Sequence, residues 1–378
     1  MRIALIRTMP HFSMDVYANG LIAGLKAIHP NWEIIELVPQ AFDRETRSLT
    51  VRAQKAYERF WRFPKKVQQQ PVDIFHIVDH SDAHIVRWLR KTGRPVVVTC
   101  HDLINILYPE NLQDSVRLPI ISDRLGRYSI QGMEYADAII AVSSETAKNV
   151  DRVLNVNRDL VTIIPNAVDP LFRPHPEEQS QAFRDRLNVP PDTFCLLNVG
   201  GNHPRKNLNT ILKAFNILKQ KGSAVQFWKI SDDFTDEDKC FIQINNLEDS
   251  IKYLGYLDKA ALVNAYNAAD VLVAPSFHEG FGITLLEAMA CGTPVITSNV
   301  SAMPEVVDDA GILVDPKNSQ ALVEAVCRLQ SDPIYYQELR DKGLKRVQAF
   351  TWENVAEKTL EVYESLLSQR LSYSPIKT

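Results

Sequence analysis

The sequence predicts an α/β fold built from two doubly wound domains, each a parallel sheet covered by helices. Short β-branched or apolar segments alternate with longer amphipathic stretches along the chain, as expected where helices connect parallel strands. The chain has 378 residues, which suggests two domains at roughly 150 residues each. A segment from Pro165 to Pro176 holds four prolines and can continue neither a helix nor a central strand.

Six candidate strands lie on each side of this proline-rich segment. In the first half they are Ile3–Arg7, Glu33–Val38, Ile74–Val78, Val96–Cys100, Ala138–Val142 and Val161–Ile164. In the second half they are Cys195–Val199, Gln226–Ile230, Lys252–Leu254, Val271–Ala274, Val295–Thr297 and Ile312–Val314. We therefore expect one domain at residues 1–168 and another at 169–351, joined by a hinge.

A last helix is predicted from Trp352 towards Leu367, with Thr351 as its N-cap. One apolar face is expected to be buried, although the pattern alone does not say which domain it covers. Its members are Val355, Leu360, Val362, Tyr363, Leu366 and Leu367.

Composition argues for a compact protein of the aqueous phase. A net charge of −4 provides no overall field for nucleic acid or anionic lipid, so an anion site has to be local. The apolar start, Met1 to Ile6, is too short for a signal peptide, and no window approaches the ~18 apolar residues of a membrane span. Five widely spaced cysteines predict neither a disulfide framework nor a structural zinc site, which makes a reducing cytoplasm the expected location.

The loop after the strand Val271–Ala274 carries the clearest chemical signal. Gly280 and Gly282 allow close approach of the backbone, and a helix beginning near Gly282 offers N–H groups to an anion such as phosphate. Glu279 precedes this helix and Glu287 lies more than one turn into it, too far apart to share a proton. We expect the two carboxylates to hold different parts of one extended ligand, such as a nucleotide sugar. The alternative is that Glu279 is solvated and Glu287 caps the helix or pairs locally.

Two further segments place chemistry at strand ends. Gly200 and Gly201 follow a strand and precede Arg205 and Lys206, cations that can neutralise a diphosphate and stabilise a leaving group; the alternative is a solvated pair. His101 follows a buried strand, where doubly wound sheets bind ligands. It can hydrogen-bond a hydroxyl when neutral or stabilise a departing oxygen as a cation, with Asp102 orienting it. On its own, this segment also fits a structural histidine.

The second half of the chain resembles the retaining glycosyltransferases of family 4. Glu279 and Glu287 match the family's E-x7-E element, followed by Glu-Ala-Met-Ala-Cys-Gly-Thr-Pro-Val from Glu287. The resemblance implies the two-domain GT-B fold, with a nucleotide-sugar donor held by the second domain and an acceptor by the first. It also implies that the last helix, 352–370, packs back on the first domain.

The resemblance also assigns roles to residues. Catalytic roles fall on His101, Glu279, Arg205 and Lys206, with His101 beside the transferred sugar. Donor binding is implied for Gly200, Gly201, Arg205, Lys206, Glu279, Gly280, Phe281, Gly282, Ile283, Thr284 and Glu287. At Pro165–Asp169, Ala167 replaces the family's usual glycine, so that turn is expected to differ slightly.

The first loop departs from the family, which often has Gly-Gly there. This chain instead has Ser13 and Asp15, which can cap the next helix or contact the acceptor. Asp102 and His80, which follows another strand, are further acceptor candidates. His76, His80 and His84 recur every four residues, but the first lies in a predicted strand, so we expect no metal site. The chain also lacks the G-x-G-x-x-G of dinucleotide oxidoreductases.

Residues 51–63 are amphipathic if helical. Ala53, Ala56, Tyr57, Phe60 and Trp61 form one stripe and Arg52, Lys55, Arg59 and Arg62 another, with Lys65 and Lys66 following. We expect the aromatic stripe to belong to the core, with the cations solvated. The alternative is peripheral contact of residues 51–66 with the inner face of an anionic membrane.

Together these observations and the resemblance predict transfer of a hexose from a UDP- or GDP-linked donor to a hydroxyl of a glycan or lipid-linked saccharide, and the resemblance implies that the transfer is retaining. Neither a cofactor nor a metal is expected, because Arg205 and Lys206 supply the positive charge. The alternatives are a non-catalytic sugar-nucleotide-binding subunit and an epimerase of the same fold. A phosphorylase would usually need a lysine for pyridoxal phosphate and a much longer chain.

Overall fold

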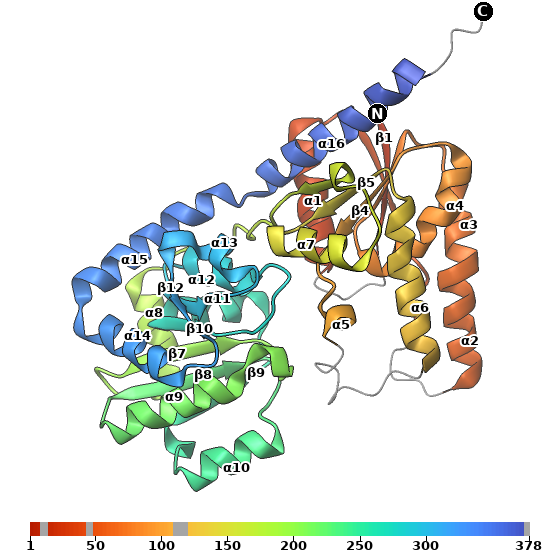
Figure 1. The fold of residues 1–378 in the computed structure, drawn as a ribbon. Coiled ribbons are helices and arrows are strands. Elements are labelled where there is room, and N and C mark those ends of the chain that lie inside the picture. Colours follow the sequence, from red (N-terminus) through yellow and green to blue (C-terminus); the bar gives the residue numbers. More distant parts are fainter. Residues whose placement is uncertain (8–13, 43–47, 109–119, 374–378) are drawn as a thin grey trace, which may run out of the picture. The chain divides into compact units, whose positions relative to one another are not determined.

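The computed structural model describes residues 1–7, 14–42, 48–108 and 120–373. Contacts divide the chain into two units (Figure 1). Unit 1 runs to Ala167 and resumes at Thr351, and unit 2 runs from Val168 to Phe350. Each unit holds a six-stranded sheet in which every pairing is parallel, so the predicted α/β fold is confirmed.

The sheet of unit 1 has the order β2-β1-β3-β4-β5-β6. Its strands are β1 (Arg2–Ile6), β2 (Glu33–Leu37), β3 (Ile74–Ile77), β4 (Val96–Cys100), β5 (Ala138–Ala141) and β6 (Val161–Ile163). The α-helices are α1 (Met14–Ile28), α2 (Leu49–Tyr57), α3 (Phe63–Gln68), α4 (Val86–Leu89), α5 (Ile104–Leu107), α6 (Ile120–Ile130), α7 (Ser144–Val153) and α16 (Trp352–Tyr373). The central strands β3, β4 and β5 are fully buried, which explains sequences that are apolar except at His76 and Thr99.

The sheet of unit 2 has the order β12-β11-β10-β7-β8-β9. Its strands are β7 (Phe194–Val199), β8 (Val225–Ile230), β9 (Ile251–Gly255), β10 (Val271–Ala274), β11 (Val295–Ser298) and β12 (Ile312–Val314). The α-helices are α8 (Glu177–Arg186), α9 (Leu208–Gln220), α10 (Asp236–Ile244), α11 (Lys259–Ala268), α12 (Ile283–Ala290), α13 (Met303–Val307), α14 (Ser319–Ser331) and α15 (Pro333–Arg346). All twelve predicted strands form, with small shifts at their ends.

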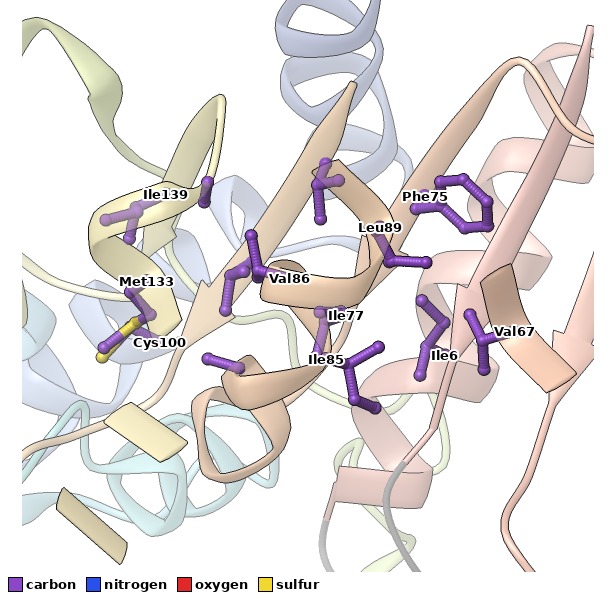
Figure 2. Packing of buried hydrophobic residues seen from close by; sticks show 14 of the residues in the cluster. Ile6, Val67, Phe75, Ile77, Ile85, Val86, Leu89, Cys100, Met133 and Ile139 are labelled. Carbon is purple, nitrogen blue, oxygen red and sulfur yellow. The ribbon is translucent and has the colours of Figure 1, made fainter. Parts of the chain in front are cut away.

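Two apolar layers cover the sheet of unit 1. On one face the side chains of Phe75 and Ile77 from β3 pack with Val67, Val86 and other residues of the covering helices (Figure 2). On the other face, α1 and α16 pack on strand residues such as Ile3 and Leu5. Burial of these side chains is the main stabilising contribution to the unit.

Helix α16 is anchored in unit 1 by the face that its sequence pattern indicates. Thr351 caps it through a hydrogen bond from the Asn354 amide, 3.2 Å. Val355 and Tyr363 are buried, and the Tyr363 hydroxyl lies 2.6 Å from Nδ1 of the buried His76. The other ring nitrogen of His76 lies 2.8 Å from Thr99 Oγ1. Both ring nitrogens of this buried histidine therefore have hydrogen-bond partners within the core.

The expectation that the aromatic stripe of residues 51–63 belongs to the core is wrong. Helix α2 buries none of its residues, and Tyr57 and Trp61 keep 59% and 55% of their surface exposed. A π-helical segment, Glu58–Arg62, separates α2 from α3, whose Phe63 and Val67 make the core contacts instead. Periodicity identified an amphipathic helix, but it could not reveal which face the rest of the unit covers.

The close approach of α1 and α16 yields a stability prediction. A Cβ added at Gly24 would lie 2.4 Å from the Trp352 carbonyl oxygen, a backbone atom that cannot rotate away. We expect Gly24→Ala to destabilise the protein by about 2 kcal/mol, because overpacking outweighs the better helix propensity of alanine. Urea unfolding followed by circular dichroism measures the change. Gly126→Ala in α6, where nothing lies within 4 Å of the added carbon, is the control and should not destabilise. Equal stability of the two variants would contradict this packing.

Candidate functional site

The candidate site of unit 2 lies where its strand order reverses. Strands β7 and β10 are neighbours in the sheet, and the chain leaves them towards opposite sides of it. In doubly wound sheets, ligands bind outside the carboxyl ends of such strands. The loop after β7 carries Arg205 and Lys206, and the loop after β10 carries Glu279.

These two loops bring three predicted residues into one charged cluster. The Glu279 carboxylate accepts a hydrogen bond from Arg205 Nη1 at 2.7 Å and from Lys206 Nζ at 2.6 Å. Arg205 also donates to the His278 carbonyl oxygen, 2.9 Å. Because two cations meet one carboxylate, the cluster keeps a net positive charge and can attract an anion.

The neighbouring serines fix the position of Glu279. Ser276 Oγ donates to the carboxylate at 2.8 Å, while Ser301 Oγ both accepts from the Glu279 amide, 3.1 Å, and donates to its carbonyl, 2.9 Å. Burial would raise the pKa of Glu279, but the charges of Lys206 and Arg205 outweigh it and lower that pKa to about 2. The carboxylate is therefore ionised throughout the neutral range, and the interpretation of Glu279 as simply solvated is wrong.

The turn after β7 is held by groups that sequence reasoning missed. The buried Lys229 donates to the Gly200 carbonyl oxygen, and Asp232 accepts from the Asn202 amide at 3.1 Å. Gly201 stands between these two anchored positions. Burial lowers the pKa of Lys229 to about 8. A lysine within an apolar strand, followed by an aspartate three residues later, was the available signal.

The loop after β10 ends at helix α12 as predicted. Gly282 is its N-cap and has φ of 101°, a conformation that side-chain-bearing residues rarely adopt. The first amides of a helix lack intrahelical partners, so Ile283 and Thr284 begin a site suited to phosphate. Phe281, by contrast, is buried and packs edge-on against Phe350, 6.0 Å between ring centroids.

Glu287 lies one turn further along α12 in a different environment. Its carboxylate accepts a hydrogen bond from the buried Tyr266 hydroxyl at 2.7 Å. Burial raises the pKa of Glu287 to about 7, although Tyr266 and the charge of Lys259 act in the opposite direction. The two glutamates of the E-x7-E element therefore differ in ionisation, and Tyr266, the partner of the second, was not predicted.

In unit 1, His101 follows β4 and is 8% exposed. Its Nε2 lies 2.8 Å from the Val78 carbonyl oxygen, an acceptor, which places the proton on Nε2 and leaves Nδ1 able to accept. Burial lowers the pKa of His101, with Asp79 opposing the shift. The neutral form, one of the two predicted states, is the one this environment favours.

The predicted acceptor residues have varied surroundings. Asp102 accepts from the Ile104 amide at 3.2 Å, so the Val78 oxygen orients His101 in place of Asp102. His80 Nδ1 lies 3.4 Å from the His101 amide and from Asp79. Asp15 pairs with Arg7 at 3.0 Å. Ser13 lies outside the described residues.

His76 and His84, which flank His80 in the sequence, have separate partners in unit 1. His84 lies 2.8 Å from Ser129 Oγ and 2.8 Å from the Arg59 carbonyl, whereas His76 contacts Tyr363 and Thr99. In the part of the chain that the structure describes, no group of three or more His, Cys, Asp or Glu side chains is arranged to hold a metal ion. Ala167 is buried without a positive φ, so its turn does not require glycine.

Two doubly wound units are the architecture of GT-B enzymes, and a cationic site lies where the strand order of the second unit reverses. Comparison with family models identifies the protein family. Residues 179–346 match the model "Glycosyl transferases group 1", and residues 32–171 match "Glycosyltransferase Family 4". The chain belongs to glycosyltransferase family 4, and it is a glycosyltransferase.

Individual relatives agree with this assignment. O-antigen chain mannosyltransferase B of Escherichia coli is 29% identical over 275 residues, covering 71% of this chain and 70% of the relative. An uncharacterized glycosyltransferase of Methanocaldococcus jannaschii, MJ1607, is 31% identical over 331 residues, covering 78% of this chain and 84% of that one. The crystal structure of Anabaena HepE in complex with UDP-glucose has a TM-score of 0.75 at 17% identity, covering 97% and 100% of the two chains.

Across the residues that the structure describes, no helix combines the length and the apolar character needed to span a bilayer.

The raised pKa of Glu287 predicts a pH-dependent stability. Between about pH 4.5 and 7 the folded state binds more protons than the unfolded state, so the free energy of unfolding falls as pH rises through this window. Glu287→Gln removes this titration and retains an oxygen for Tyr266. We expect the variant to gain up to about 3 kcal/mol relative to the wild type between pH 4 and pH 8.

Urea unfolding at both pH values measures this gain. The control is Glu338→Gln on α15, an exposed residue that pairs with Lys342 at 3.0 Å. Parallel pH dependence in the wild type and Glu287→Gln would contradict a buried, protonated carboxyl.

Proposed function

We propose that this enzyme transfers a hexose, with retention, from a UDP- or GDP-linked donor to a hydroxyl of a glycan or lipid-linked saccharide. The observation that carries the proposal is the pairing of Arg205 and Lys206 with Glu279 at the carboxyl ends of the neighbouring strands β7 and β10. Such a cluster can exchange part of its internal pairing for a diphosphate. Two similar proteins support the proposal: the mannosyltransferase from E. coli and HepE, whose structure contains UDP-glucose.

The proposed donor lies along the charged cluster and α12. Lys206 and Arg205 bind the diphosphate, together with the first amides of the helix after Gly282. Glu279 is held in position by Ser276 and Ser301, and its carboxylate oxygens accept hydrogen bonds from hydroxyls of the sugar. Glu287 accepts hydrogen bonds from the ribose, with Tyr266 holding it in place.

The chemical step we propose needs no covalent enzyme intermediate. The bond between the anomeric carbon and the β-phosphate oxygen breaks, and the acceptor oxygen bonds to the same face of that carbon. The acceptor proton passes to the departing phosphate. Arg205 and Lys206 stabilise the charge on that leaving group, so the proposal includes neither a divalent metal nor another cofactor.

His101 has a supporting role in this scheme. Its neutral ring, with Nε2–H directed to Val78, can accept a hydrogen bond from a sugar hydroxyl through Nδ1. Low exposure and a lowered pKa argue against an imidazolium that stabilises the leaving oxygen. His80 and Asp102, near the same strand ends of unit 1, remain the proposed acceptor-side contacts, together with Asp15 and Ser13.

The donor can be identified by thermal unfolding with a panel of UDP- and GDP-linked hexoses. A compound that binds only the folded state raises the midpoint, and at a hundredfold excess over its dissociation constant it contributes about 2.7 kcal/mol. We expect a member of the panel to raise the midpoint of the wild type, and Lys206→Ala to remove most of the shift. If no panel member stabilises the protein, the proposed donor class is wrong.

Variants of the cluster separate donor binding from transfer. Glu279→Gln releases Arg205 and Lys206 from their carboxylate, so we expect the affinity for a nucleoside diphosphate to be retained or increased. Transfer should nevertheless fall by at least about 100-fold, because the sugar loses its carboxylate contact. Lys206→Ala should lower both the affinity for the nucleoside diphosphate and the rate of transfer.

Calorimetry with UDP and GDP and a transfer assay with the identified donor measure these two quantities. Glu338→Gln is the matched control, and circular dichroism establishes that each variant is folded. Transfer by Glu279→Gln at the wild-type rate would refute the assignment.

A further inference from the structure

Residues around the junction of α2 and α3 that lie outside the core of unit 1 form an exposed surface that combines aromatic and basic side chains. The aromatic–basic ridge comprises Tyr57, Trp61, Lys65 and Lys66, at the junction of α2 and α3 (Figure 1). Tyr57, Trp61 and Lys65 follow one another at intervals of four residues and therefore share one face. We propose that this ridge docks on an anionic lipid bilayer, an interaction separate from the transfer reaction proposed above.

Exposure of the aromatic side chains is the first observation. Tyr57 and Trp61 are 59% and 55% exposed, and Leu49 at the start of α2 is 78% exposed. Trp61 contacts Trp88 edge-on, 5.2 Å between ring centroids. Amphipathic aromatic rings favour the boundary between lipid headgroups and acyl chains.

The charge of the chain segment that contains the ridge is the second observation. Residues 51–94 contain ten lysines and arginines against four acidic residues, in a chain whose net charge is −4. The four acidic side chains are engaged within unit 1. Glu58 pairs with Arg62, Asp82 pairs with Arg59, Asp73 accepts from the Arg2 amide, and Asp79 accepts from the Ser81 amide.

The exposed cations Lys65 and Lys66, in contrast, form no ion pair among the described residues. The local field is therefore positive where the aromatic rings are exposed, and it complements an anionic membrane.

A cavity beside the ridge provides a place for one headgroup. It has a volume of about 500 Å³ and is lined by Arg62, Lys65, Lys66 and Gln69, with Phe63 and Val38 among its apolar walls. Glu58 also lines it, and its carboxylate is paired with Arg62. Cationic and amide groups over an apolar base match a phosphate attached to an acyl chain. A bilayer of anionic phospholipid therefore fits this surface better than an acidic peptide, which would leave Tyr57 and Trp61 in water.

Vesicle flotation of the full chain tests the proposal. We expect the protein to float with vesicles of phosphatidylcholine and phosphatidylglycerol, to stay behind with phosphatidylcholine alone, and to be released by salt. Two double variants, Tyr57→Ala with Trp61→Ala and Lys65→Glu with Lys66→Glu, should each reduce binding at least tenfold. The control combines Ile334→Ala with Lys358→Glu, both exposed and remote from the ridge in sequence.

Two further readouts complete the test. The emission of Trp61 should shift to the blue on binding anionic vesicles, and Trp61→Phe should remove that shift. Transfer to a soluble acceptor should be unchanged in the ridge variants, so failure of the donor assignment would leave this test intact. Flotation that is absent, or that is equal in the ridge and control variants, overturns the proposal. Tighter binding to poly-glutamate or nucleic acid than to the vesicles would also overturn it.

Discussion

The ion cluster between the loops after β7 and β10 is the interaction on which the proposed donor site depends. One carboxylate, Glu279, holds two cations at 2.6–2.7 Å and offsets the repulsion between them. The parallel sheet creates the cluster, because it brings the carboxyl ends of strands that are distant in sequence to one edge. The net positive charge then makes this edge suited to a diphosphate.

The polar groups of the two units differ in protonation, and therefore in the hydrogen bonds and charges that they can offer. Two cations keep Glu279 ionised, whereas burial without a direct cationic contact leaves Glu287 near its titration point. Burial also keeps His101 neutral, which restricts it to hydrogen bonding. A sequence motif assigns the same letter to both glutamates, but the surroundings give them different chemistry.

The fold could be predicted from alternating apolar segments, and Arg205, Lys206 and Glu279 could each be selected from their loops. Their direct pairing could not, because 73 and 74 residues separate the partners and only the sheet brings them together. Ser276, Ser301 and Tyr266 were missed because each is a common residue type without a local motif, whereas Lys229 was missed although its place inside an apolar strand was a signal. The aromatic stripe was assigned to the core because periodicity does not identify the covering element; the exposed Tyr57 and Trp61 corrected that assignment.

The most direct measurement is a crystal structure with the bound nucleotide sugar. The proposed mode of donor binding predicts that the diphosphate lies within hydrogen-bonding distance of Lys206 Nζ or Arg205 and of the first amides of α12. It also predicts that Glu279 faces the sugar and Glu287 the ribose. A diphosphate bound away from the carboxyl ends of β7 and β10, with the ion cluster of Arg205, Lys206 and Glu279 unchanged, would contradict this mode of binding.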